Sequence, residues 1–318
     1  MLSEFDLIAK YFTRPPRHAV RGAGDDAALL AVGPGNELAV TTDMLVEGVH
    51  FFADVDAGAL GHKALAVNLS DLAAMGATPR YAMLSLALPA VDEAWLAKFC
   101  AGFFRLADEH GVDLIGGDTT RGPLNLCIQA MGEVPRGQAL RRDGAHVGDD
   151  VWVSGTLGEA AAAVAERNGS LRLPAGARDA CRARLDRPAP RIALGVALRG
   201  VAHAAIDVSD GLLADLGHIC ERSRIGAVVD ADRLPCAAGL QPLRHDAAMM
   251  RAIAAGGDDY ELCFTAPPSR RARIEALSGN LGLPLTRIGR IVAGSAVRLE
   301  DGQGRPIDLQ GHGFEHFR

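Results

Sequence analysis

Six short acidic motifs lie along most of this chain, and their residue types suit the binding of metal ions and phosphate. Each motif places an Asp beside Gly, Ser, Thr or a second Asp: GDD (24–26), TTD (41–43), NLSD (68–71), GGDTT (116–120), DVSDG (207–211) and GGDD (256–259). Mg²⁺ takes six oxygen ligands and commonly bridges carboxylates to phosphates. Gly beside the carboxylate leaves room for a bulky anion, and Ser or Thr adds a neutral oxygen. The set predicts several ions shared with a polyphosphate.

A structural interpretation competes at each single motif, because Asp-Gly and Ser-Asp pairs are also common in turns and helix N-caps. Gly116-Gly117 would either present backbone N–H groups to a phosphate or form a tight turn from strand to loop. Ser209 would cap the helix that follows, bind a nucleotide or do both. Six motifs together favour the ligand-binding interpretation.

The common nucleotide-binding signatures are absent from the sequence. Gly61-His62-Lys63 lacks the Ser or Thr that completes a P-loop, and no G-x-G-x-x-G opens a helix after a strand. There is also no G-x-S-x-G or H-E-x-x-H motif. The acidic motifs must therefore account for any phosphate chemistry.

Composition excludes several classes of protein. The 318 residues carry a net charge of −6 and no basic run, which argues against a nucleic-acid partner. No stretch reaches the ~20 apolar residues of a membrane span, and the N-terminus lacks the apolar core of a signal peptide. None of the six cysteines lies in a C-x-x-C pair, so a structural zinc site is not expected. We expect a protein of the reducing cytoplasm.

Apolar periodicity predicts strands and helices in both halves of the chain. Helices are expected at 5–12, 60–75, 92–110, 158–167 and 212–222, and strands at 36–50, 112–115, 124–134, 151–153, 204–208, 228–230 and 261–265, with short strands from 285 onward. Asp92 and Gly111 suit the two caps of the second helix. The alternation predicts an α/β or α+β protein of two domains. The polar segment 135–148 marks the boundary, giving domains 1–138 and 139–318.

Taken together, the motifs resemble those of the thiamine-monophosphate kinase family. The resemblance lies in GDDAAL (24–29), TTDMLVEGVHF (41–51), KALAVNLSDLAAMGATP (63–79), LIGGDTTRGPL (114–124), AIDVSDGLLADLGHI (205–219) and GGDDYELCFT (256–265), and it extends in order to Gly313-Phe314. The broader fold family includes aminoimidazole ribonucleotide synthetase. The resemblance implies two α/β domains, with N-terminal sheets that pair into a barrel across a homodimer.

The resemblance also implies an activity and a set of site residues. The activity is transfer of the γ-phosphoryl group of ATP to thiamine monophosphate, with the N-terminal domain binding ATP and Mg²⁺ and forming the dimer, and the C-terminal domain completing the substrate site. The implied Mg²⁺ ligands are Asp26, Thr41, Thr42, Asp43, Asp71, Asp118, Asp207 and Asp210. The implied ATP contacts are Gly117, Asp118, Arg142 and Ser209, and the implied substrate contacts are His50, Asp258 and Phe314. The family commonly has Glu where this chain has Asp258, which is one methylene shorter.

Elementary chemistry agrees with this activity. A phosphate monoester has a second pKa near 6, so at neutral pH it is a dianion that needs no general base; we expect no catalytic base. Two unit charges ~4 Å apart repel by roughly 4 kcal/mol at an effective dielectric of about 20, so the difficulty is to bring two anions together. Cations held by the carboxylates offset that repulsion.

Alternative functions and roles remain open from the sequence. The nearest is another ATP-using synthetase of the same fold, such as aminoimidazole ribonucleotide synthetase; a non-catalytic metal-binding scaffold is a third. A selenophosphate synthetase would need a reactive residue near its N-terminus, whereas the first cysteine here is Cys100. A hydrogenase-maturation relative would end in Cys, and this chain ends in Arg318. His50 would otherwise be a polar residue near a strand end, and Phe314 an apolar plug.

Overall fold

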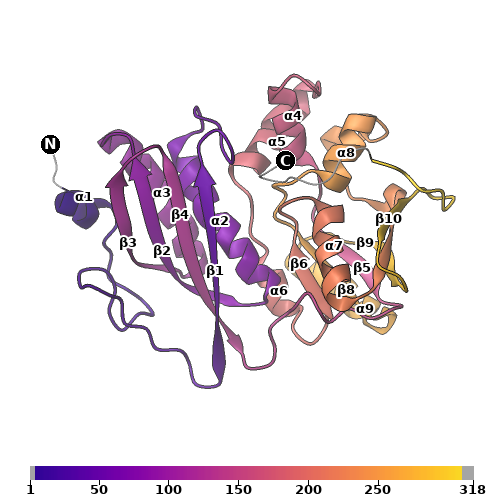
Figure 1. Ribbon diagram of the computed structural model, residues 1–318, viewed down its shortest axis with the longest axis horizontal. Helices are drawn as coiled ribbons and strands as arrows, with labels where there is room; N and C mark the ends of the chain where they lie inside the picture. The colour runs from indigo at the N-terminus through magenta and orange to yellow at the C-terminus, as the bar shows by residue number, and fades with distance from the viewer. Residues whose placement is uncertain (1–3, 310–318) are drawn as a thin grey trace. The chain divides into compact units, whose positions relative to one another are not determined.

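The structure is a computed structural model that describes residues 4–309, in two compact units. Unit 1 contains Met1–Leu72 and Ala77–Gly137, and unit 2 contains Ala73–Gly76 and Gln138–Arg318. Among the described residues, none of the helices is long and apolar enough to span a membrane. Each unit is described by itself below (Figure 1).

Unit 1 is built on an open four-stranded sheet in the order β1-β4-β2-β3. The strands are β1 (Asn36–Val46), β2 (Thr78–Leu88), β3 (Asp113–Arg121) and β4 (Asn125–Pro135). β4 pairs antiparallel with β1 and β2, whereas β2 and β3 are parallel. The sheet is not closed within the described residues, so the expected barrel across a dimer remains a proposal.

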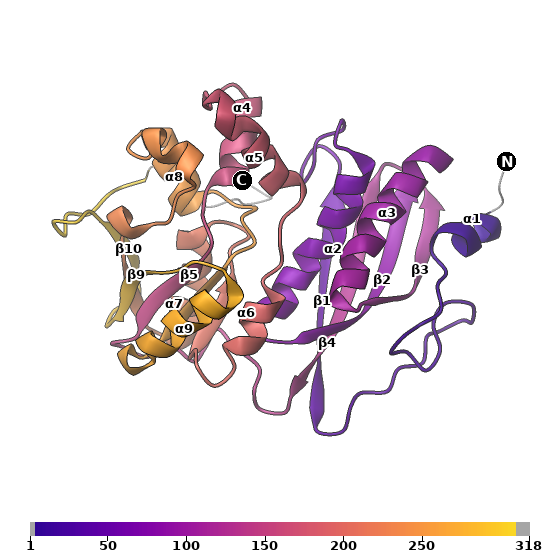
Figure 2. The same cartoon turned by 180° about the vertical axis from the view of Figure 1, so that it is seen from behind.

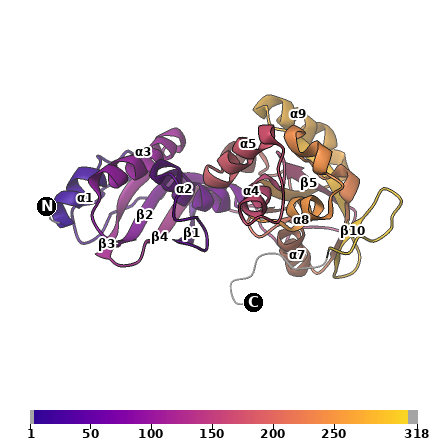
Figure 3. The ribbon, with the colours of Figure 1, turned by 90° about the horizontal axis from the view of Figure 1, so that it is seen from above.

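Helices cover one face of this sheet. Figures 2 and 3 show α2 (Ala57–Ala74) and α3 (Glu93–His110) together on that face, with α1 (Glu4–Tyr11) beyond β3. The side chain of Asp92 accepts the N–H groups of Ala94 and Trp95, and Gly111 ends α3, which confirms both predicted caps. We call the covered side the helix face and the other side the open face.

The two faces of the sheet differ in burial because side chains alternate along a strand. Leu84 and Ile128 point to the helix face and are buried. Figure 3 shows no helix on the open face in the described part of unit 1, and Val40 and Met44 of β1 are 62% and 56% exposed. The open face of unit 1 is therefore partly apolar and accessible within this chain.

Unit 2 contains a mixed six-stranded sheet in the order β10-β7-β9-β5-β8-β6. Its strands are β5 (Asp150–Ser154), β6 (Ala204–Asp207), β7 (Gly226–Asp230), β8 (Leu262–Ala266), β9 (Leu285–Val292) and β10 (Val297–Glu300). Its α-helices are α4 (Glu159–Arg167), α5 (Ala175–Asp186), α6 (Ile192–Ala197), α7 (Leu212–Ser223), α8 (Ala247–Ala255) and α9 (Arg271–Leu281). Only the β7–β10 pair is parallel.

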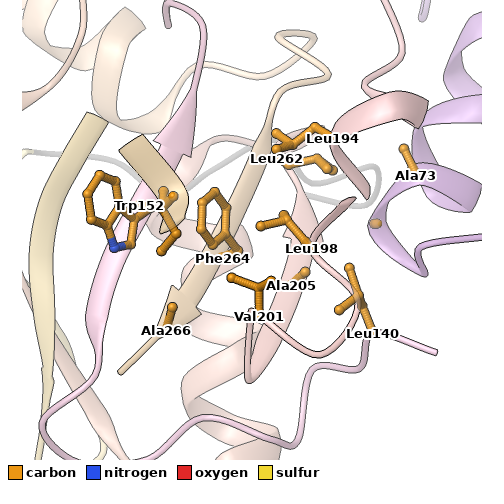
Figure 4. Close-up of a cluster of buried hydrophobic side chains, with 12 residues drawn as sticks. Ala73, Leu140, Trp152, Leu194, Leu198, Val201, Ala205, Leu262, Phe264 and Ala266 are labelled. Atoms are coloured by element: carbon orange, nitrogen blue, oxygen red, sulfur yellow. The ribbon is translucent and has the colours of Figure 1, made fainter. Parts of the chain in front are cut away.

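A cluster of buried side chains joins β5, β6 and β8 to α6 in unit 2. Trp152 and Phe264 stack with ring centroids 6.4 Å apart, and Leu194, Leu198 and Val201 pack beside them (Figure 4). Burial of such side chains contributes about 25 cal/mol per Å² of apolar surface. This core fixes the strands whose ends carry the polar motifs of unit 2.

At two motifs, one of the alternative interpretations was wrong. The GGD sequence at 116–118 lies inside β3 rather than in a turn after it, because β3 pairs with β2 as far as Arg121. The N-cap of α7 is Gly211, with no side-chain capping bond, so Ser209 does not cap that helix. In both places, contacts with distant segments decide the backbone conformation.

Candidate active site

Two of the predicted acidic motifs line one cavity of unit 1. The cavity has a volume of about 520 Å³, and its polar lining includes Asp25, Asp26 and Asp118. Phe12 and Met83 contribute apolar surface to the same cavity. The structure therefore brings Asp26 together with Gly116-Gly117-Asp118, as a shared ligand site requires.

Gly117 is needed for the backbone path of β3 beside this cavity. Its φ of +151° is a conformation that L side chains rarely adopt. A Cβ atom at this position would lie 1.8 Å from the carbonyl oxygen of Leu84, its partner on β2. The site therefore requires glycine here for close packing of two strands, and the exposed backbone lies next to Asp118.

A second pair of predicted ligands meets on the helix face. Thr41 Oγ1 on β1 donates a hydrogen bond to Asp71 Oδ2 on α2. Asp43 is two residues from Thr41 and so points to the same face. Thr42 points to the other face, and its Oγ1 donates to the carbonyl oxygen of Ile128 at 3.0 Å.

Strand register separates these ligands into two groups. Asp43, Ile128, Leu84 and Gly117 form one row across the four strands. Asp118 belongs to the next row, with Ser85, Cys127 and Met44, and that row faces the open side. Within unit 1, Thr41, Asp43 and Asp71 therefore share the helix face, whereas Asp118 lies on the open face.

His50 is held by the turn that follows β1. Its Nδ1 accepts the backbone N–H of Val46 at 3.0 Å, so the proton of a neutral ring lies on Nε2. Lys63 Nζ on α2 donates to the carbonyl oxygen of His50 at 3.2 Å. The first contact orients the ring and the second holds the backbone of His50. Contact of the ring with substrate stays a prediction.

In unit 2, backbone N–H groups of the DVSDG motif donate to the carboxylate of Asp215, a residue that was not predicted from the sequence. Asp215 in the first turn of α7 is 2% exposed, and its Oδ2 accepts the N–H groups of Ser209, Asp210 and Gly211 at 3.0, 3.1 and 3.1 Å. Burial and the charge of Asp210 raise the pKa of Asp215 to about 7, although the three N–H groups act in the opposite direction. The sequence feature that could have indicated this role is the position of Asp215, four residues after Gly211 and inside the helix expected at 212–222.

The GGDD motif is joined to this loop by backbone hydrogen bonds. The N–H of Asp258 donates to Ser209 O at 2.9 Å, and that of Tyr260 donates to Val208 O at 2.8 Å. A Cβ atom at Gly257 would lie 2.4 Å from Ser209 O, so only glycine permits this approach. Asp258, at φ +68°, accepts a hydrogen bond from Tyr260 Oη at 3.0 Å. Ser209, Asp210 and Asp258 are thus neighbours.

A buried polar network lies behind these two motifs. Glu261 is fully buried and accepts hydrogen bonds from Ser154 Oγ at 2.5 Å, Arg184 Nη2 at 2.7 Å and Arg191 Nε at 2.6 Å. Both carboxylate oxygens of Asp259 accept the N–H of Gly158, at 3.0 and 2.9 Å. The second Asp and the Glu of GGDDYEL therefore hold the turn in place.

The structure does not bring Arg142 to Ser209. The carbonyl oxygen of Arg142 accepts a hydrogen bond from Ser223 Oγ at 2.9 Å, at the C-terminal end of α7. Ser209 precedes the N-terminal end of that helix, and twelve helical residues span about 18 Å. Arg142 as an ATP contact stays a prediction, and Phe314 lies outside the described residues.

The donor chemistry of the predicted metal ligands fits Mg²⁺. All eight offer carboxylate or hydroxyl oxygen and none offers nitrogen or sulfur, which matches a hard dication. Asp207 is the last residue of β6 and is 4% exposed, two residues before Ser209, where the loop that Asp215 holds begins. A buried carboxylate of this kind needs a compensating positive charge or hydrogen bonds.

Comparison with known proteins gives the family. The families described as AIR synthase related protein, N-terminal domain and C-terminal domain, match residues 24–134 and 146–302. The thiamine-monophosphate kinase of Escherichia coli K12 is 46% identical over 319 aligned residues, covering 99% of this chain and 98% of that protein. The chain belongs to the thiamine-monophosphate kinase family. The kinase of Haemophilus influenzae is 41% identical over 330 aligned residues, covering 100% of this chain and 98% of that protein.

Solved structures of the thiamine-monophosphate kinase family share the fold. The kinase of Stenotrophomonas maltophilia K279a is 52% identical, with a TM-score of 0.85 and coverage of 92% of this chain and 93% of that one. A structure described as AaThiL complexed with AMPPCP and TMP is 31% identical, with a TM-score of 0.79 and coverage of 90% and 89%. The hydrogenase maturation protein HypE, at 23% identity and a TM-score of 0.76, shares the fold alone.

Proposed function

We propose that this chain transfers the γ-phosphoryl group of ATP to thiamine monophosphate, giving thiamine diphosphate and ADP. The observation that carries the proposal is similarity over nearly the whole length to thiamine-monophosphate kinases, at 46% identity to the Escherichia coli protein. The related structure that contains AMPPCP and TMP supports both substrates, since AMPPCP has a methylene group in place of the bridging oxygen between the β- and γ-phosphates of ATP.

The proposed reaction is a direct in-line transfer assisted by several Mg²⁺ ions. The acceptor is itself a phosphate dianion, so the chain need not supply a general base. Bound Mg²⁺ would supply positive charge against the phosphates. The proposed ligands are Asp26, Thr41, Thr42, Asp43, Asp71, Asp118, Asp207 and Asp210.

The remaining roles of the chain are to bind and orient the two substrates. We assign Gly117, Asp118, Arg142 and Ser209 to ATP, and His50, Asp258 and Phe314 to thiamine monophosphate. Asp215 holds the Ser209–Gly211 backbone, and Tyr260 Oη holds the Asp258 carboxylate. In this scheme residues 1–138 are the ATP- and Mg²⁺-binding and dimerisation domain. Residues 139–318 complete the substrate site and add the ligands from Arg142 and the DVSDG motif. Such fixed contacts reduce the reorganisation needed before reaction.

A homodimer formed through the open face of unit 1 is part of the proposal. Val40 and Met44 are 62% and 56% exposed on this face, and Met83, Cys127 and Met131 are partly exposed beside them. Apolar surface of this kind is typical of protein interfaces. We also propose a cytoplasmic enzyme, a location that suits the unpaired thiols of its cysteines.

A product assay tests the proposed function. Purified protein is incubated with ATP, Mg²⁺ and thiamine monophosphate, and ADP and thiamine diphosphate are quantified by chromatography. We expect equal amounts of the two products, no product after chelation of the metal, and little product with free thiamine as the acceptor. If folded protein released no thiamine diphosphate under these conditions, the proposal would be wrong.

A further inference from the structure

Three potential metal ligands converge in unit 2, and none of them belongs to an acidic motif. His146 Nδ1 and His203 Nδ1 are 3.1 Å apart, and His203 Nδ1 lies 2.9 Å from Asp149 Oδ2 and 3.1 Å from Asp149 Oδ1. One ligand atom from each residue falls within 4.8 Å of the others. Asp149 is buried, His203 is partly exposed and His146 is exposed.

One proton on either Nδ1 atom cannot satisfy all the hydrogen-bond contacts of His203 Nδ1 with His146 and Asp149. If His146 donates its proton to His203 Nδ1, the lone pair of His203 Nδ1 also faces the Asp149 carboxylate, which only accepts. If His203 Nδ1 carries the proton, that one proton must be shared between His146 Nδ1 and the Asp149 carboxylate. A cation among the three would accept a lone pair from each.

The separations match the scale of a coordination sphere. Zn–N bonds of about 2.0–2.1 Å in a tetrahedron put neighbouring ligand atoms about 3.3 Å apart. The contacts of His203 Nδ1 with His146 Nδ1 and with the Asp149 carboxylate, at 2.9 to 3.1 Å, are slightly shorter than this value. The two imidazole rings meet edge to face, with centroids 4.7 Å apart and an interplanar angle of 82°, so they are not stacked.

Hydrogen bonds tie the segments that carry the three ligands to the sheet of unit 2. Asp149 immediately precedes β5; its carbonyl oxygen accepts the N–H of Ile291 at 2.8 Å, and its Oδ2 accepts the N–H of His146 at 2.9 Å. His203 immediately precedes β6, and its N–H donates to Thr265 O at 2.8 Å. A site on rigid elements needs little rearrangement to bind an ion.

The site is separate from the DVSDG motif of the same unit. His203 and Asp207 lie at opposite ends of β6, and four residues of strand span roughly 13 Å. The strand register agrees. Ala204, next to His203, pairs with Thr265 near the end of β8, and Asp150, next to Asp149, pairs with Ala266 at its last residue. Asp207 instead pairs with Leu262, the first residue of β8. An ion bound at His203 would therefore lie at the opposite end of β6 from Asp207.

We propose that His146, Asp149 and His203 form a binding site for a borderline transition-metal dication of the Zn²⁺ class. Two imidazole nitrogens and one carboxylate favour such an ion over Mg²⁺. Three protein ligands leave one position for water or an anion, and His203 also lines a cavity of about 360 Å³ that includes Ser269 and Arg270. The ion would join the segments that precede β5 and β6, and so stabilise unit 2.

The test uses the full chain with Zn²⁺, and with Co²⁺ as a visible-absorption probe, in excess Mg²⁺ that occupies the acidic motifs. Calorimetry should give one Zn²⁺ per chain, Co²⁺ should show the intense absorption of tetrahedral coordination, and Zn²⁺ should raise the melting temperature. His146→Ala and His203→Ala should each weaken Zn²⁺ binding by at least about 100-fold, since loss of an outer-shell partner alone costs 10–100-fold.

His218→Ala is the matched control, since His218 lies on α7 of the same unit, half exposed beside Glu221. It should bind Zn²⁺ like the unmodified chain. Because His146 is exposed, His146→Ala keeps the test valid if His203→Ala does not fold. The proposal is overturned if the unmodified chain shows no saturable Zn²⁺ binding, or if His146→Ala binds Zn²⁺ with unchanged affinity.

Discussion

Thr41 and Asp71 are joined by a hydrogen bond from Thr41 Oγ1 on β1 to Asp71 Oδ2 on α2. Their motifs are thirty residues apart in the sequence and become neighbours because α2 packs on the helix face of the sheet. The bond holds the Asp71 carboxylate in place before any ion arrives. Asp118, by contrast, lies on the open face of the same sheet, so unit 1 presents its predicted ligands in two groups.

Asp43→Asn, Asp71→Asn and Asp118→Asn should each lower kcat by roughly 10²-fold or more, the scale for loss of one preorganised charge-stabilising group. Melting temperatures should stay near that of the unmodified chain, because the amide keeps the shape of the carboxylate. Steady-state kinetics with thiamine monophosphate checks this. Asp179→Asn on the exposed side of α5 is the control and should have full activity. Near-normal activity in all three variants would contradict the metal assignment.

Asp215→Ala should destabilise unit 2 by about 3 kcal/mol or more, because three backbone N–H groups would lose a buried acceptor. Asp215→Asn should be much milder, since its side-chain oxygen can still accept those bonds. Urea denaturation followed by circular dichroism measures the difference between the two variants. Equal stability of Asp215→Ala and the unmodified chain would show that the DVSDG backbone does not depend on this residue.

The stability of unit 2 should depend on pH through Asp259. Burial raises the pKa of Asp259 well above its usual value, against the hydrogen bonds from Gly158 and the charge of Arg184. The folded state then holds this proton more tightly than the unfolded chain, so the contribution of Asp259 to unfolding free energy falls as pH rises above about 4.

Asp259→Asn should remove this contribution, because the amide does not titrate. The melting temperature of the variant, relative to that of the unmodified chain, should therefore increase between pH 5 and pH 8. Asp179→Asn is again the control, and its difference from the unmodified chain should not change with pH. A constant difference for Asp259→Asn across this range would contradict the prediction.

Asp258→Ala should raise the KM for thiamine monophosphate and leave the KM for ATP unchanged, the signature of lost uniform binding. Asp258→Glu should be tolerated or slightly more active, because Glu has the longer reach that the family commonly has here. A bridging water that serves the shorter Asp258 costs at most about 2 kcal/mol, so the gain should be small. Tyr260→Phe removes the bond that orients the carboxylate and should show a smaller effect in the same direction. Unchanged kinetics for Asp258→Ala would make this position purely structural.

Val40→Glu combined with Met44→Glu should convert the proposed homodimer into a monomer, because both side chains are exposed on the open face of unit 1. Light scattering at micromolar concentration measures the mass. Val91→Glu, another exposed apolar residue outside the sheet, should remain dimeric. A monomeric unmodified chain would refute the dimer itself.

The sequence by itself determined the features that depend on near neighbours. Asp92 and Gly111 predicted the ends of α3, because caps are local interactions. The apolar runs predicted most strands, and the six motifs with their order were sufficient to identify the family. Each of these depends on spacing along the chain.

Tertiary structure decided what depends on register and on distant partners. Pairing with β2 extends β3 through GGD, and strand alternation puts Asp43 and Asp118 on opposite faces. The backbone N–H of Ser209 donates to the Asp215 carboxylate, and Ser209 does not cap α7. His146 and His203 precede different strands and meet only because β5 and β6 both pair with β8. Long-range pairing has no fixed separation in sequence, so no local pattern could predict these contacts.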